Sequence, residues 1–212
     1  MKIGVLALHG AVIEHIQTLR AIGVEPIPVR LPEDLEGISG LILPGGESTT
    51  MRKLVARWGL REPIMALARS GAPILGTCAG MIIVAREIAG GEEPVFPLLD
   101  VTVERNAFGR QLESFETDLA MPILGDRPVH AIFIRAPVIE RLGPGVEVLA
   151  RLPDQRVVAV RQRNVIAISF HPELAGETRI HRLVATMAAE YAEPGEGTAV
   201  AGTEPWSLGE AR

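Results

Sequence analysis

The sequence contains little cysteine, few aromatic residues and no long apolar run. One cysteine occurs in 212 residues, and aromatic residues make up 4% of the chain. A single cysteine cannot form a disulfide within the chain, which predicts a reducing, cytoplasmic location. No apolar stretch approaches the roughly 20 residues of a membrane-spanning helix. The chain begins at once with a strand pattern over residues 2–8, so we expect no signal peptide.

Basic charge is also scarce. Lysine and arginine number 21 against 26 acidic residues, for a net charge of −5, and no basic cluster is present. This balance argues against a nucleic-acid partner. The histidines show no metal-ligand spacing, and the glycines form neither a phosphate loop nor a dinucleotide fingerprint. We therefore expect no metal and no cofactor.

The one cysteine lies in a Gly-x-Cys-x-Gly pattern. Cys78 follows a short apolar run behind Pro73, is flanked by Gly76 and Gly80, and precedes a helical pattern over residues 79–89. This arrangement predicts a tight strand-to-helix turn of the nucleophile-elbow type, in which flanking glycines relieve Cβ clashes. The helix start would favour the thiolate. A buried structural cysteine is the alternative interpretation.

A base and its orienting group are available near the carboxyl-terminal end. The apolar strand pattern over residues 165–170 runs directly into His171, Pro172 and Glu173. Residues two apart in an extended chain point to the same side, so Glu173 could hold one imidazole nitrogen while the other faces Cys78. These three side chains are the candidate catalytic residues.

A glycine pair follows another buried strand pattern. Gly45 and Gly46 come after residues 41–43 and before a helical stretch that runs to Trp58, with Ser48 or Thr49 as the expected N-cap. Backbone N–H groups at Gly46 and Ala79 could form an oxyanion hole, although a plain Gly-Gly turn is equally compatible with the pattern.

The order of predicted elements indicates the fold class. Strands and helices alternate in the first half, which predicts an α/β fold of three layers, α/β/α, with a mostly parallel central sheet. The second half has short strands with few helical patterns between them, which predicts an added antiparallel portion. We expect one domain over residues 1–191 and a disordered tail over residues 192–212. The expected strands cover residues 2–8, 25–30, 40–43, 101–105, 114–118, 131–135, 146–151, 157–162 and 165–170, and expected helices cover 12–22 and 176–191.

Several segments together resemble the class I, triad-type glutamine amidotransferases, and within them the glutaminase subunits of pyridoxal 5′-phosphate synthases. The resemblance covers about residues 1–191. The most specific segments are Gly-Gly-Glu-Ser-Thr-Thr at residues 45–50, Val-Glu-Arg-Asn-x-Phe-Gly-Arg-Gln at 103–111 and Phe-Ile-Arg-Ala-Pro at 133–137.

The resemblance implies a glutaminase that hydrolyses L-glutamine to L-glutamate and ammonia and passes the ammonia to a synthase subunit in a hetero-oligomeric complex. It assigns Cys78 as nucleophile, His171 as general base and acid, and Glu173 as its orienting group. The residues that it implies for substrate binding are Gly46, Glu47, Ser48, Arg105, Ile134 and Arg135.

The chain departs from the family pattern at one position, where Leu8-His9-Gly10 replaces the usual Leu-Gln-Gly. In the family this amide lies near the active site and the face that meets the synthase. His9 therefore bears on oxyanion-hole formation and on activation by the partner.

Three other functions remain open from the residues alone. The chain could be a triad glutaminase of another pathway, a cysteine hydrolase acting on peptides or small aldehydes, or an inactive docking subunit. An assay of ammonia release from glutamine would distinguish a cysteine hydrolase of other substrates from a glutaminase. Labelling of Cys78 by a glutamine-like electrophile would exclude an inactive docking subunit.

Overall fold

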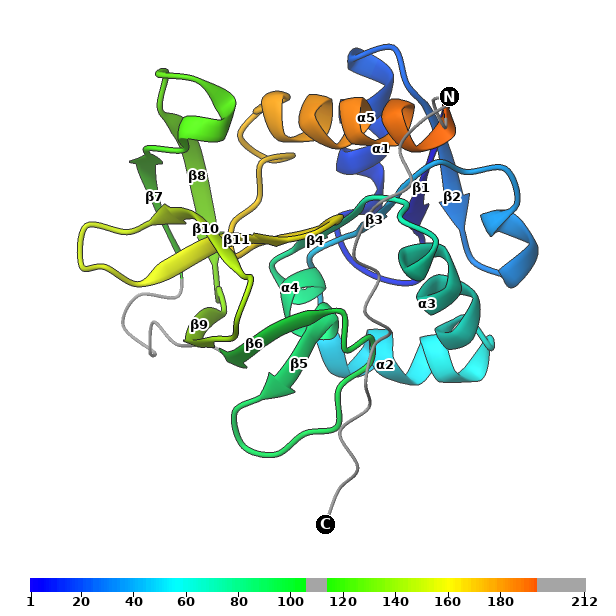
Figure 1. The fold of residues 1–212 in the computed structure, drawn as a ribbon, viewed down its shortest axis with the longest axis horizontal. Helices are drawn as coiled ribbons and strands as arrows, with labels where there is room; N and C mark the ends of the chain where they lie inside the picture. The colour runs from blue at the N-terminus through cyan, green and yellow to red at the C-terminus, as the bar shows by residue number, and fades with distance from the viewer. Residues whose placement is uncertain (106–113, 194–212) are drawn as a thin grey trace.

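A large sheet with helices on both faces forms the centre of the computed structural model, which describes residues 1–105 and 114–193 (Figure 1). Its strands run in the order β2-β1-β3-β4-β12-β11-β9-β6-β5, and β10 pairs with β11 beside this path. The strands are β1 (Lys2–Leu6), β2 (Glu25–Val29), β3 (Leu41–Leu43), β4 (Ile74–Thr77), β5 (Ala85–Ile88), β6 (Leu99–Glu104), β9 (Val138–Leu142), β10 (Glu147–Arg151), β11 (Val157–Gln162) and β12 (Val165–Ile168).

The sheet is parallel from β2 to β12, antiparallel from β12 through β11 and β9 to β6, and parallel again between β6 and β5. A separate antiparallel pair joins β7 (Ser114–Leu119) to β8 (Val129–Ile134). The mostly parallel sheet with an added antiparallel portion is thus confirmed.

Helices cover the two faces of the sheet as the alternating pattern predicts. Helices α1 (Val12–Ala21) and α5 (Arg179–Ala192) lie on one side, and α2 (Ser48–Arg57), α3 (Arg61–Arg69) and α4 (Ala79–Val84) lie on the other (Figure 1). Two short 3-10 helices, η1 (Pro32–Leu35) and η2 (Pro122–Leu124), complete the elements of the described residues.

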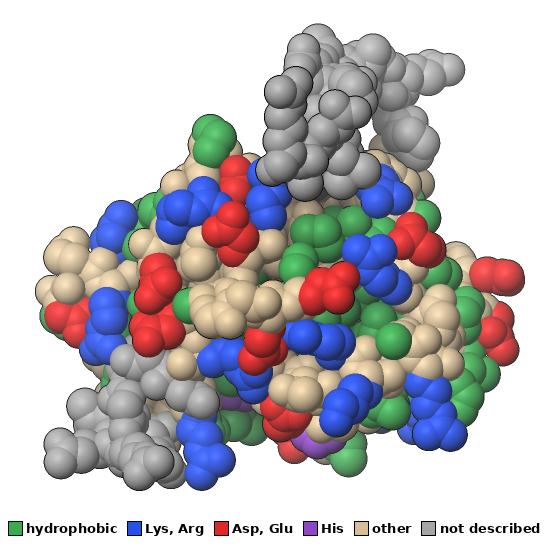
Figure 2. All heavy atoms as spheres, turned by 90° about the horizontal axis from the view of Figure 1, so that it is seen from below, with side chains coloured by type: hydrophobic (Ala, Val, Ile, Leu, Met, Phe, Trp, Pro, Cys, Tyr) green, Lys and Arg blue, Asp and Glu red, His purple; other side chains and the backbone are tan. Residues whose placement is uncertain are grey.

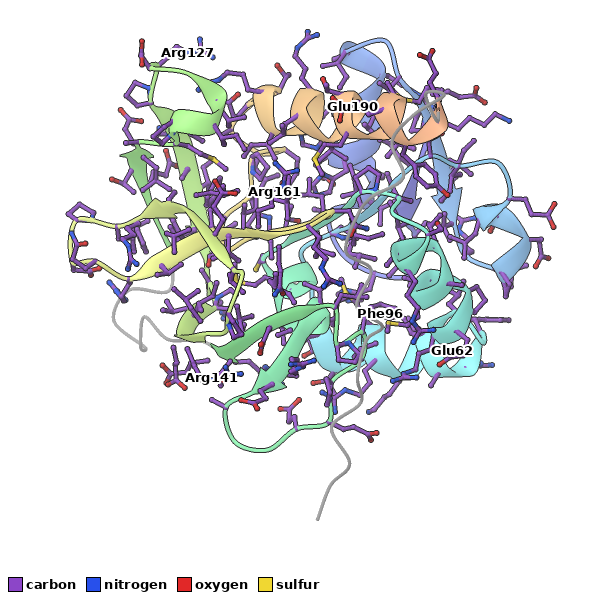
Figure 3. The ribbon with its side chains drawn as sticks, viewed as in Figure 1. Glu62, Phe96, Arg127, Arg141, Arg161 and Glu190 are labelled. Carbon is purple, nitrogen blue, oxygen red and sulfur yellow. The ribbon has the colours of Figure 1, made fainter. Side chains whose placement is uncertain are left out.

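Side-chain alternation along the central strands builds two apolar layers. On β1, Ile3 and Val5 join the layer beneath α1 and α5, whereas Leu6 joins the layer beneath α2 and α3. Phe96, fully buried, belongs to the second layer and lies beside α3 in Figure 3, where the labelled Glu62 and Arg141 lie at the periphery. Burial on both faces explains why these strands are continuous apolar runs.

The predicted helix over residues 79–89 is wrong in its second half. Helix α4 ends at Val84, and Ala85 adopts an extended conformation at the start of β5. The β-branched run of residues 82–84 has low helix propensity, and pairing of β5 with β6 favours the strand. Helix α3 and strand β9 were also not predicted, whereas the closing helix begins three residues later than expected, at Arg179.

Some predicted segments cannot be compared with the structure. Residues 106–111 of the Val-Glu-Arg-Asn-x-Phe-Gly-Arg-Gln segment and residues 194–212 of the tail lie outside the described residues. Helix α5 does extend to Ala192, one residue past the expected domain end. On the face that Figure 2 shows, acidic and basic side chains are interspersed rather than gathered by sign.

Candidate active site

The candidate residues meet at one edge of the sheet. The chain leaves β1 toward β2 and later returns to β3 on the other side of β1, and ligands of open α/β sheets bind at the carboxyl ends of strands beside such a switch. The carboxyl ends of β1, β3, β4 and β12 surround a cavity of about 520 Å³. It is lined by His9, Gly10, Ala11, Gly45, Gly46, Glu47, Ser48, Cys78, Ala79, Ile82, Arg105, Ile134, Arg135, His171 and Leu174.

Cys78 occupies a strained turn between β4 and α4. Its backbone has φ 49° and ψ −106°, a conformation that side-chain-bearing residues rarely adopt. A Cβ on Gly80 would lie 2.0 Å from the carbonyl oxygen of Leu43, and one on Gly76 would lie 2.6 Å from the backbone of Gly80. The geometry therefore requires both flanking glycines, as the elbow interpretation predicts.

His171 and Glu173 form a buried pair beside the cysteine. Nδ1 of His171 lies 2.7 Å from Oε1 of Glu173, and the backbone N–H of His171 donates to the carbonyl of Ile132 at 2.8 Å. Burial alone would lower the pKa of His171, but hydrogen bonds and charge interactions with Cys78 and Glu173 raise it to about 10. The imidazole is thus protonated at neutral pH, with Nε2 left for the sulfur.

Cys78 is further held by the strand on its other side. The Sγ of Cys78 lies 3.7 Å from the carbonyl oxygen of Ile134, which accepts from the sulfur when it carries a proton. Ile134 ends β8, and Arg135 follows with φ 45°; both side chains are exposed and line the cavity.

The glycine pair packs directly against the catalytic residues. A Cβ on Gly45 would lie 2.3 Å from Cε1 of His171 and 3.2 Å from Cβ of Cys78. Two hydrogen bonds from the loop after β1 hold this segment: the N–H of Ala11 donates to the carbonyl of Gly45 at 3.1 Å, and Nδ1 of His9 accepts from the N–H of Glu47 at 3.3 Å. His9 therefore touches the segment that carries the expected Gly46 donor.

Arg105 lies in the cavity wall between two carboxylates. Its guanidinium donates to Oε1 of Glu92 at 2.6 Å and to Oε1 of Glu47 at 3.3 Å. Burial acts to raise the pKa of Glu47, but hydrogen bonds from Thr50 and Thr49 lower it to about 2, so this carboxylate is charged. Arg105 therefore forms two ion pairs and also lines the cavity.

Glu47 also corrects the predicted start of α2. Its carboxylate accepts from the N–H groups of Thr49 at 3.2 Å and Thr50 at 2.7 Å, so Glu47, rather than Ser48 or Thr49, is the N-cap. Serine and threonine are stronger N-cap signals than glutamate, which explains the error. Ser48 is instead buried within the first turn and lines the cavity.

Every predicted site residue except Glu173 lines the cavity, and Glu173 reaches it through His171. The lining residues Ile82 and Leu174 were not predicted as site residues. Both residues lie within two positions of a motif residue in the sequence, and this proximity is the signal that would have identified them. Glu92 has no such signal, because a 13-residue separation hides its contact with Arg105.

The described residues, 1–105 and 114–193, contain neither a metal-binding cluster nor a membrane-spanning helix. No group of three or more His, Cys, Asp or Glu side chains there is arranged to hold a metal ion. In the same ranges no helix combines the length and apolar character needed to cross a membrane.

Comparisons with known proteins agree on one family. The model of the SNO glutamine amidotransferase family matches residues 5–190. The pyridoxal 5′-phosphate synthase subunit PdxT of Pelotomaculum thermopropionicum is 57% identical over 86% of this chain and 92% of its own length. The protein of the same name from Herpetosiphon aurantiacus is 55% identical over 86% of this chain and 98% of its own. A crystal structure of a glutamine amidotransferase has a TM-score of 0.83 and 49% identity, covering 88% of this chain and 98% of that one.

Proposed function

This chain belongs to the SNO glutamine amidotransferase family and works as the glutaminase of a pyridoxal 5′-phosphate synthase, and we propose that it does so through Cys78, His171 and Glu173. The observation that carries the residue assignment is the 2.7 Å contact of His171 with Glu173 beside a cysteine on a strained elbow. A nucleophile, a base and an orienting carboxylate in this order form a catalytic triad.

The charge state of the pair indicates how the reaction begins. An imidazolium beside the sulfur favours a thiolate, which attacks the side-chain carboxamide carbon of glutamine. The C–N bond of the resulting tetrahedral intermediate then breaks, Nε2 of His171 gives its proton to the departing ammonia, and a thioester remains. Neutral His171 next takes a proton from water, whose oxygen attacks the thioester, and glutamate leaves as the thiolate re-forms.

We propose that the backbone N–H groups of Gly46 and Ala79 stabilise the oxyanion. Ala79 is the first residue of α4, and the first N–H groups of a helix have no acceptor within the helix. Gly46 is supported by the two hydrogen bonds from the loop after β1. Such donors act on charge that develops only in the transition state.

The rest of the cavity suits the polar end of free glutamine. Its α-carboxylate can be held by the guanidinium of Arg105 and by the positive charge of Arg135, and its α-ammonium by the charged Glu47. We propose these roles, with Ser48 and Ile134 completing the binding wall. Both are lining residues of the same cavity.

The partner is a synthase subunit that consumes the ammonia. We propose a hetero-oligomeric complex in the cytoplasm that has no nucleic-acid partner, in which docking completes the oxyanion hole and prevents idle hydrolysis. We further propose that residues 1–191 act as one glutaminase domain, because both apolar layers pack on the same sheet.

Glutamate production from glutamine, with and without a purified synthase subunit, tests this function. We expect slow hydrolysis by the isolated chain and a large increase on addition of the synthase. Cys78→Ala should bind the synthase and produce no glutamate. Equal rates with and without the synthase would overturn the proposed activation, and an active Cys78→Ala protein would overturn the nucleophile.

A further inference from the structure

Two histidines that the proposed mechanism does not use lie behind the triad. His15 on α1 and His181 on α5 are both fully buried, and Nδ1 of His15 lies 2.9 Å from Nε2 of His181. Nε2 of His15 lies 3.1 Å from Oγ1 of Thr77 and 3.5 Å from Oε2 of Glu173. A continuous line of polar side chains therefore runs from α5 through α1 to the triad.

The outer oxygen of Glu173 needs a donor that the triad does not supply. Oε1 is used by His171, whereas Oε2 is buried and has no hydrogen-bond partner within ordinary distance. A buried carboxylate oxygen without a donor is costly. His15 offers a ring nitrogen 3.5 Å away, and a small shift of either side chain would complete the bond.

The surroundings determine where the protons of the two rings lie. Burial, followed by the nearby rings of His181 and His171, lowers the pKa of His15. Burial also lowers the pKa of His181 to about 4, although the backbone and the charge of Glu177 act to raise it. Both rings are therefore neutral at pH 7, and each has one N–H. A lone pair on Nε2 of His15 would face the carboxylate, so the favourable tautomer places the proton there.

This tautomer of His15 also determines the tautomer of His181. Nδ1 of His15 must then accept, so Nε2 of His181 donates to it. The remaining atom, Nδ1 of His181, carries no proton in this arrangement and makes no hydrogen bond of ordinary geometry within the described residues. The backbone of Glu177 is close enough to raise the pKa of this ring, but burial outweighs it. An unpaired acceptor is less costly than an unpaired N–H donor would be.

We propose that His15 is a positioning residue for the triad, which donates from Nε2 to the outer oxygen of Glu173 while His181 holds it in the required tautomer. The bond holds the carboxylate in the plane that presents Oε1 to His171. The inference rests on the proposed triad and adds two residues that act through it, one on each helix of the α1 and α5 layer.

Two variants of equal polarity test the proposal. The carboxamide of His15→Gln can reach the place of Nε2, whereas the shorter His15→Asn reaches only the place of Nδ1. We expect His15→Asn to lower kcat by about 10- to 100-fold with little change in KM, the range found when the outer hydrogen-bond partners of metal ligands are removed. His15→Gln should recover most of kcat.

Glutamate production is measured on the full chain with its synthase subunit, and the thermal midpoint of each variant is recorded. Alkylation of Cys78 by iodoacetamide provides a second measurement on the chain alone, and it reports one site because the sequence has one cysteine. We expect His15→Asn to need a higher pH for half-maximal alkylation and His15→Gln to match the original chain.

Glu173→Gln distinguishes the hypothesis of the triad from the hypothesis that His15 positions it. An active Glu173→Gln protein would overturn the triad itself. An inactive Glu173→Gln protein together with a fully active His15→Asn protein would overturn only the role of His15. If both His15 variants lose stability and kcat equally, the contact is structural and the positioning role is wrong.

Discussion

At the scale of single residues, the planar guanidinium of Arg105 can bind Glu47, Glu92 and the α-carboxylate of glutamine at the same time. Glu47 and Glu92 occupy two of its edges, and the cavity lies beside it. A lysine at this position would keep the charge but lose the fork that holds a carboxylate through two bonds. We expect Arg105→Lys to raise KM for glutamine about tenfold, equivalent to about 1.4 kcal/mol, and to change kcat much less.

Arg141→Lys is the matched control for Arg105→Lys. Arg141 also pairs with two carboxylates, those of Glu87 and Asp100, but it lies outside the cavity. Steady-state kinetics with the synthase present should show an unchanged KM for this control. A similar rise in both variants would indicate a general loss of surface ion pairs rather than a substrate contact.

His9 is the residue at which the chain departs from the family pattern, and its bond to the N–H of Glu47 indicates what it does. A glutamine side chain has a carbonyl oxygen that can accept the same bond, whereas alanine has no acceptor. We expect His9→Gln to keep synthase-activated glutaminase activity and His9→Ala to lower kcat. Equal activity of His9→Ala and the original chain would show that this bond does not support the oxyanion hole.

At the scale of elements, the elbow depends on how closely α4 approaches β3. The Cβ of Gly80→Ala would lie 2.0 Å from the carbonyl oxygen of Leu43, so the helix and the strand must separate. We expect a loss of about 1–3 kcal/mol in the free energy of unfolding, the usual cost of overpacking, together with reduced activity as Cys78 shifts. Denaturant unfolding and glutamate production measure the two effects.

Gly23→Ala is the control for Gly80→Ala, because it introduces backbone strain without a steric clash. Gly23 has φ +79° at the end of α1, and a Cβ there meets no atom within 4 Å. Its cost should be about 1–2 kcal/mol from the backbone alone, with full activity retained. A Gly80→Ala protein as stable and active as Gly23→Ala would contradict the close approach.

Elements differ in how far sequence alone predicts them. The strands before Gly45, Cys78 and His171 could be predicted because each is an apolar run, buried on both faces of the sheet, that ends at a glycine or proline turn. The site residues lie at these turns. Strands β5 and β9 were missed because their identity depends on pairing with β6, which no local pattern encodes. For the same reason the contacts of Glu92 with Arg105 and of His15 with Glu173 were not predicted.

At the scale of the whole molecule, the two apolar layers share one sheet, and the layer of α1 and α5 contains His15 and His181. The pKa of each ring is lowered in the folded chain, so below about pH 6.5 the unfolded chain binds protons that the folded chain does not. The contribution of these histidines to stability is therefore complete above pH 6.5 and is lost as pH falls below it, toward about pH 4 for His181.

We expect the free energy of unfolding to fall between pH 6.5 and pH 5 with a slope that approaches about 1.4 kcal/mol per pH unit for each buried ring. His181→Leu should reduce this slope, because it removes one of the two rings. His130→Leu is the control: its exposed ring lies between Asp118 and Glu116, which raise its pKa, so its contribution is present at low pH and is lost only as pH rises. Denaturant unfolding at several pH values measures all three proteins, and a slope that His181→Leu leaves unchanged would show that this ring is not held neutral by burial.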